Sequence, residues 1–99
     1  MESNFSDRLS LIRGVCESWH GWNEYQRKAA CRALFWLSDE LIELAQRTAY
    51  PNNLNYVLGY LRGIQRCADE AAASGNLDIE EVHSAIVKIG GMAQDPPLP

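Results

Sequence analysis

The sequence predicts an all-α fold, a small bundle of three to four antiparallel helices. Apolar residues recur at steps of three and four along most of the chain, and turn signals interrupt them at helix-length intervals. No segment alternates apolar and polar residues over the length of a strand. The loops are short, which favours antiparallel neighbours. The 99 residues fit one helical domain at residues 1–93, followed by a disordered, proline-rich tail at residues 94–99.

The first predicted helix begins at Ser6, whose hydroxyl is suited to cap free backbone N–H groups, and ends at Gly21. Its apolar residues form one stripe, made of Leu9, Ile12, Val15, Cys16 and Trp19. Trp19 therefore belongs to the core. Trp22 is left open, because the two tryptophans either cap the bundle or form an exposed aromatic corner.

The second predicted helix is the longest and runs from about Glu24 to Arg47. Asn23 and Gln26 have the spacing of a capping box, in which each side chain bonds the other residue's backbone N–H. Tyr50 before Pro51 marks the stop, since proline disfavours helical geometry in the preceding residue. The core stripe is Ala30, Leu34, Leu37, Leu41, Leu44 and Thr48, widened by Cys31, Phe35, Ile42 and Ala45.

The third predicted helix spans roughly residues 53–74, with Gly75 as its C-terminal cap. A fourth begins after a second capping box, Asp78 with Glu81, and ends at Gly90-Gly91. The core stripe of the third helix is Leu54, Val57, Leu58, Leu61, Ile64, Ala68 and Ala71, and that of the fourth is Ile79, Val82, Ile86 and Ile89.

The charge balance argues against direct binding of nucleic acid. Nine Lys and Arg stand against thirteen Asp and Glu, a formal net charge of −4, whereas phosphate binding needs a basic face. The N-terminus lacks the basic and apolar regions of a signal peptide, and no apolar run approaches the roughly 20 residues of a membrane span. Three cysteines, an odd number, do not suggest a disulfide framework. We therefore expect a reduced, cytoplasmic setting and no membrane association.

No catalytic or metal-binding motif is present in the sequence. Cys16 and His20 are four residues apart, but zinc needs three or four ligands and nothing nearby supplies the others. No third group orients a Cys–His nucleophilic pair, and no glycine-rich phosphate loop occurs. We expect neither an enzyme nor a bound metal or cofactor.

Trp36 is the most informative residue of the sequence. With about 100° of rotation per residue, the apolar half of the second helix centres on Leu34 and Cys31. Trp36 falls on the opposite side, together with the charged residues Arg32, Asp39, Glu40, Glu43 and Arg47. Tryptophan and arginine are enriched at interface hot spots. Either a partner covers this side chain, or a terminal segment or another helix folds over it.

A second unusual face lies on the third helix. Tyr56, Tyr60, Gly59 and Gly63 lie off the core stripe, with Cys67 below them. Each glycine costs about 1 kcal/mol in a helix interior, so we expect a close backbone approach to compensate. The packing is either within the chain or between chains.

These features predict a protein-binding regulator that covers a surface of its partner. The candidate contact residues are Arg32, Phe35, Trp36, Tyr56 and Tyr60. A homodimer is also expected, since symmetry buries surplus apolar surface in a small domain.

The stretch Val15-Cys16-Glu17-Ser18-Trp19-His20-Gly21-Trp22, followed by Ala33-Leu34-Phe35-Trp36-Leu37 in the long helix, resembles small bacterial quorum-sensing antiactivators. Members of that family are short helical proteins that bind an acyl-homoserine-lactone receptor and block its dimerisation. The resemblance covers the first half of the chain and assigns no site residue. It implies that the partner is a transcription factor and that binding blocks its dimerisation or DNA binding.

Two other classes of function remain open. One is a helical oligomer that binds a nucleotide or other small ligand between its subunits. Arg62, Arg66, Tyr56 and Tyr60 would supply the phosphate and stacking contacts. The other is a phage- or toxin-related inhibitor of a host enzyme, which differs from the regulator only in its partner.

Overall fold

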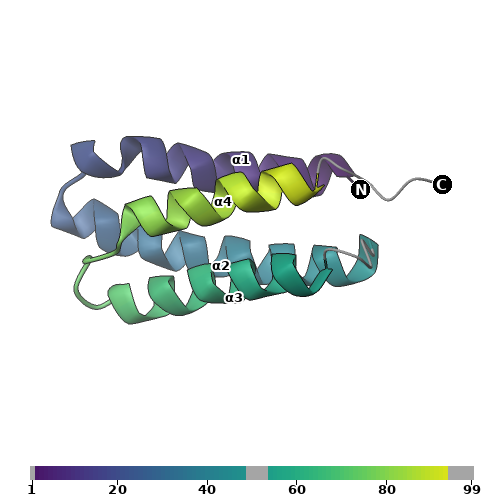
Figure 1. The fold of residues 1–99 in the computed structure, drawn as a ribbon. Helices are drawn as coiled ribbons and strands as arrows, with labels where there is room; N and C mark the ends of the chain where they lie inside the picture. Colours follow the sequence, from purple (N-terminus) through teal and green to yellow (C-terminus); the bar gives the residue numbers. More distant parts are fainter. Residues whose placement is uncertain (1, 49–53, 94–99) are drawn as a thin grey trace.

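The computed structural model describes residues 2–48 and 54–93. Over these residues it contains four α-helices, one 3-10 turn and no strand, which confirms the predicted fold class. The elements are α1 (Glu2–Ser18), η1 (Trp19–Gly21), α2 (Glu24–Thr48), α3 (Leu54–Ala71) and α4 (Ile79–Ala93). The helices run alternately up and down along a bundle of 46 × 20 × 20 Å (Figure 1). The start of α1 and the end of α4 therefore lie at the same end.

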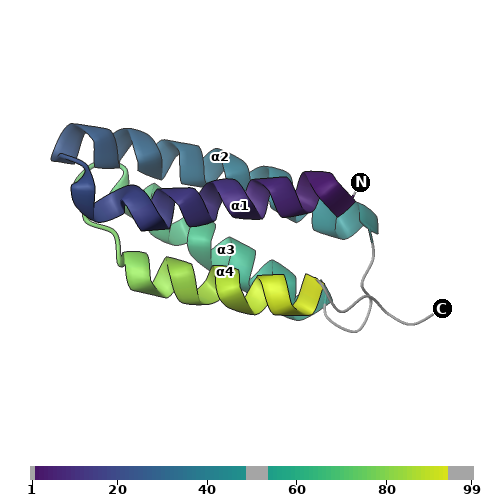
Figure 2. The same ribbon diagram turned by 90° about the horizontal axis from the view of Figure 1, so that it is seen from above.

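Each helix has two principal neighbours. α1 packs against α2 and α4, and α3 packs against the same two helices from the other side (Figure 2). The contact between α2 and α3 is the most extensive, and the contact between α3 and α4 is the smallest of the four. In the described part of the chain, none of the helices combines the length and the apolar character that crossing a membrane requires.

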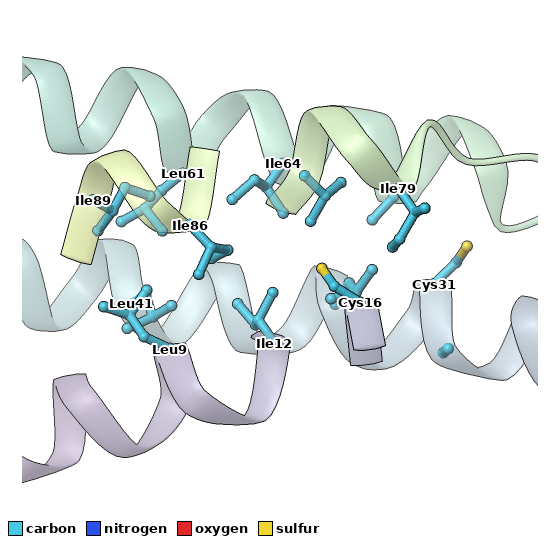
Figure 3. Packing of buried hydrophobic residues seen from close by; sticks show 14 of the residues in the cluster. Leu9, Ile12, Cys16, Cys31, Leu41, Leu61, Ile64, Ile79, Ile86 and Ile89 are labelled. Carbon is cyan, nitrogen blue, oxygen red and sulfur yellow. The ribbon is translucent and has the colours of Figure 1, made fainter. Parts of the chain in front are cut away.

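The core lies where the four apolar stripes meet. Figure 3 shows side chains from all four helices pointing into this shared interior, among them Leu9, Leu41, Leu61 and Ile89. Leu34 and Leu41 of α2 are completely buried. The other side chains with at most 2% exposure are Ile12, Cys31, Ser38, Leu61, Ile64, Ala68, Val82, Ile86 and Ile89. The apolar stripes that the sequence predicts therefore form the core of the bundle.

Capping explains where the helices begin and end. The backbone N–H of Asn23 donates to Gln26 Oε1 at 3.0 Å, and the backbone N–H of Gln26 donates to Asn23 Oδ1 at 2.8 Å. These two bonds form the predicted capping box of α2. Gly75 closes α3 with a φ of +75°, a conformation that glycine adopts without a steric penalty. Its N–H donates to the carbonyl of Ala71 at 2.7 Å.

Arg27 joins η1 to the first turn of α2. Its Nε donates to the carbonyl of Trp19 at 3.0 Å, and its Nη2 donates to the carbonyl of His20 at 3.3 Å. The guanidinium carbon also lies 5.5 Å from the centre of the Trp19 ring. Trp19 is buried and Trp22 packs half-buried against the core. The two tryptophans therefore cap the bundle rather than form an exposed corner.

Several predicted boundaries are wrong. α1 begins at Glu2, so Ser6 lies within the helix and does not cap it. α3 ends at Ala71 rather than at residue 74, because the chain turns before Gly75. α4 continues through Gly90 and Gly91 to Ala93, since burial of Ile86 and Ile89 holds the helix against the core. The predicted stop at Tyr50-Pro51 and the tail at residues 94–99 lie outside the described residues.

Truncating a core leucine should destabilise the bundle strongly. Leu41→Ala removes a fully buried side chain from the centre of α2, and we expect a loss of about 3 kcal/mol in the free energy of unfolding. Leu11→Ala is the matched control, because Leu11 is 57% exposed. Its effect should stay within about 0.5 kcal/mol. Urea denaturation of both variants measures the difference, and equal losses would contradict the proposed core.

Candidate functional site

Trp36 lies on the solvent face of α2, as the helical wheel predicts. Its side chain is 65% exposed, and no described segment folds over it. Phe35, the preceding residue, is half-buried and packs against the core. The ring centres of Phe35 and Trp36 lie 6.5 Å apart and their planes are inclined by 87°, an edge-to-face arrangement. The half-buried phenylalanine thus packs against the exposed indole.

Trp36 borders a groove between α2 and α3 with a volume of about 270 Å³. We call it the Trp36 groove. Its lining is formed by Cys31, Arg32, Phe35 and Trp36 of α2, by Ala68 and Asp69 of α3, and by Ala72 just after the end of α3. The structure therefore brings together three of the predicted contact residues, Arg32, Phe35 and Trp36. The small side chains of the two alanines leave the space that forms the groove.

Two charged side chains line this groove, Arg32 of α2 and Asp69 of α3, and among the described residues no ion pair joins them. Glu43 pairs with Arg47 at 2.6 Å, Glu40 pairs with Arg8 of α1, and Asp39 accepts a hydrogen bond from Gln65 at 3.3 Å. Arg32 is exposed and makes no hydrogen bond or ion pair with any described residue. Its guanidinium is thus available to an acidic group from outside.

The two tyrosines lie on a different side of α3. Tyr60 is half-buried and Tyr56, one turn earlier, is 66% exposed. Tyr60 borders a groove of about 350 Å³ between α3 and α4, which we call the Tyr60 groove. It is lined by Gly59, Tyr60, Gly63, Ile64 and Cys67 of α3 and by Glu81, Val82, Ser84, Ala85 and Lys88 of α4. The predicted contact residues therefore form two surfaces, not one.

Gly59 and Gly63 face open space. A methyl group added to either would meet no heavy atom within 4 Å among the described residues. The sequence left two arrangements open for these glycines, packing within the chain or packing between chains. The first is wrong for the described residues, because no helix of this chain packs closely over Gly59 and Gly63. α4 passes beside this face at a distance that leaves the Tyr60 groove open.

The only two histidines meet across a third groove, which sequence reasoning missed. His20 and His83 line it together with Cys16, Glu17 and Glu80, between the end of α1 and the start of α4. Finding this pair requires knowing that α1 and α4 are neighbours, which no spacing in the sequence reveals. Within residues 2–48 and 54–93, no group of three or more His, Cys, Asp or Glu side chains is arranged to hold a metal ion.

Burial raises the pKa of each of the three thiols above its ordinary value. Loss of hydration is the largest cause for Cys16, Cys31 and Cys67. The negative charge of Glu81 raises the pKa of Cys67 further, and Arg66 opposes it. All three are free thiols. A protonated thiol is a poor nucleophile, so Cys16 and Cys31 have the character of core cysteines, whereas Cys67 is half-exposed.

Comparison of the chain with protein-family models, with curated proteins and with solved structures finds no match.

The glycines should respond to substitution in opposite directions. Gly63→Ala should stabilise the protein by about 1 kcal/mol, because alanine has the higher helix propensity and the new methyl group meets open space. Gly75→Ala should destabilise it by about 1 kcal/mol, because its φ of +75° is unfavourable for a residue with a Cβ. Thermal unfolding of both variants tests this. Destabilisation by Gly63→Ala would mean that something packs closely on that face.

The thiols should differ in reactivity toward a disulfide reagent. Cys67 is half-exposed and should react first, whereas Cys31 is fully buried and should react on the order of tenfold more slowly, after local opening. The rate of reaction of an unperturbed thiol levels off near its ordinary pKa of 9.0. Because the pKa of Cys67 is raised, its reaction rate should keep rising above that pH. Stopped-flow labelling measures this, with Cys67→Ala to assign the fast phase. Equal rates at Cys31 and Cys67 would refute the assignment.

Proposed function

We propose that this chain is a non-enzymatic regulator that binds a helix of a partner protein in the Trp36 groove and thereby covers a functional surface of that partner. The exposure of Trp36 beside this groove is the observation that supports the proposal. Full burial of a large apolar side chain contributes roughly 2–3 kcal/mol, so a partner that covers Trp36 gains substantial binding energy. Isolated exposed aromatics are common, but this one adjoins an apolar groove and an arginine.

The composition of the groove indicates the chemistry of the partner. Phe35 and Ala72 offer an apolar space between two helices, which suits a side chain from an amphipathic helix. Arg32 on the α2 side of the groove suits a carboxylate of that helix, whereas Asp69 on the α3 side repels one, so an acidic residue of the partner belongs at the Arg32 edge. Trp36 and Arg32 belong to the residue types that contribute most to binding at interfaces. The expected ligand is thus a helix with an apolar residue near an Asp or Glu.

Such a protein acts by occlusion and needs no catalytic group. A partner helix that is held in the groove is withdrawn from its own dimer or from its own target. The resemblance to quorum-sensing antiactivators makes a receptor transcription factor the specific partner that we propose. A phage- or toxin-related inhibitor of a host enzyme, the alternative that differs only in its partner, would use the same docking surface. We also retain homodimerisation as part of the proposal, with the second copy related by symmetry.

The alternative of a nucleotide-binding oligomer is less well supported by the geometry. It requires Arg62 and Arg66 to act beside Tyr56 and Tyr60. Neither arginine lines the Tyr60 groove, and both are exposed. The structure therefore does not gather the two arginines and Tyr60 in the lining of one groove.

Replacing Trp36 should greatly weaken the affinity for the partner without unfolding the protein. We expect Trp36→Glu to weaken the affinity of a purified partner by about 30-fold or more, the effect of losing a hot-spot residue. Candidate partners are captured from cell lysate with the tagged chain, then purified and titrated calorimetrically. Tyr25→Glu is the matched control, since Tyr25 is an exposed aromatic of the same helix (83%) that lies outside the groove.

The proposal fails if Trp36→Glu and wild type bind the purified partner equally, or if Tyr25→Glu loses affinity to the same extent. Light scattering after size-exclusion chromatography reports the oligomeric state of each variant. A change from dimer to monomer in Trp36→Glu, with partner affinity unaltered, would assign Trp36 to self-association instead.

A further inference from the structure

The Tyr60 groove has the dimensions of a small-molecule site. Its volume of about 350 Å³ falls at the lower end of the range for ligand pockets, roughly 300–1,000 Å³. It lies along the α3–α4 contact, the least extensive of the four helix contacts. Ile64, Val82 and Ala85 give it an apolar lining.

Two residues of the sequence keep this groove open. A Cβ atom added at Gly59 or Gly63 would meet no described heavy atom within 4 Å, and each glycine costs about 1 kcal/mol of helix stability. Neither lies in the left-handed region of the backbone, unlike Gly75, so neither is required by the local conformation. Nothing in the described chain offsets this cost. Occupancy of the groove by another molecule would offset it.

The two charged residues that line the groove, Glu81 and Lys88, lie at different points along its length. Lys88 Nζ lies 5.5 Å from the centre of the Tyr60 ring, and no described carboxylate pairs with it. Glu81 stands seven residues earlier on α4, roughly 10 Å along the helix, near Cys67. A ligand with one anionic end therefore has one favoured orientation. Its anion meets Lys88, and its apolar body extends over Ile64 toward the other end.

We propose that the Tyr60 groove is a binding site for a small amphiphilic carboxylate. The ammonium of Lys88 binds the carboxylate, the Tyr60 ring flanks it, and the apolar body lies on the open glycine face. This site is independent of the Trp36 groove, because the residues of α3 that line the two grooves are on different sides of the helix. Failure of either proposal leaves the other untouched.

The test uses the full chain and two probes, octanoate and its neutral analogue octanamide. Octanoate should shift the backbone amide resonances of Gly59 and Gly63 saturably in two-dimensional NMR spectra. Lys88→Gln should weaken octanoate binding by about tenfold, the loss of one charge-assisted contact, and should leave octanamide binding unchanged. Lys28→Gln is the matched control, since Lys28 is the only other lysine and pairs with Glu24 at 3.5 Å on α2.

Gly63→Leu provides a second variant that fills the groove. Its Cβ meets open space and the rest of the side chain enters the groove that Gly63 lines, so the variant should remain folded and should lose binding of both probes. The proposal is overturned if octanoate binds no better than octanamide, or if Lys88→Gln and Lys28→Gln behave alike. It is also overturned if a folded Gly63→Leu still binds octanoate, or if the shifted resonances lie outside α3 and α4.

Discussion

Burial of the α2 stripe is the constraint on which the rest of the structure depends. α2 is the longest helix, and its fully buried residues Leu34 and Leu41 face α1 on one side and α3 on the other. A chain of this size buries little more than 60% of its unfolded surface, so it has few apolar contacts to spare. α4 then completes the bundle by closing the remaining side against α1 and α3. The order of the helices around the core follows from covering this one stripe.

The same constraint determines what stays outside. Once Leu34 and Cys31 face the core, helical geometry turns Trp36 toward solvent. Moving it inward would require rotating α2 by about half a turn and exposing the leucines. Local interactions reinforce the observed rotation: the Asn23–Gln26 capping box fixes the helix start, and Arg27 ties that first turn to η1. The exposed indole is therefore a consequence of the core, and its position is as well defined as the core itself.

The two grooves have different physical origins. The Trp36 groove lies along the most extensive helix contact and exists because the small side chains of Ala68 and Ala72 lie opposite a large aromatic of α2. The Tyr60 groove lies along the least extensive of the four contacts, where two glycines remove side chains from the helix surface. α3 separates the grooves, so occupancy of one does not block the other.

The sequence by itself determined the helical class, the core stripes, the capping box of α2 and the exposure of Trp36, because each of these follows from the 3.6-residue period or from neighbouring residues. The helix ends at Glu2 and Ala93 were missed, since packing against the core extends helices beyond local start and stop signals. Only the tertiary structure decided which helices are neighbours. The arrangement of the helices places Tyr60 and Trp36 in different grooves and leaves Gly59 and Gly63 open. It also places His20 and His83 in the lining of one groove. Contacts between distant residues depend on how the stripes are arranged around a common core, and the period of a single helix carries no information about that arrangement.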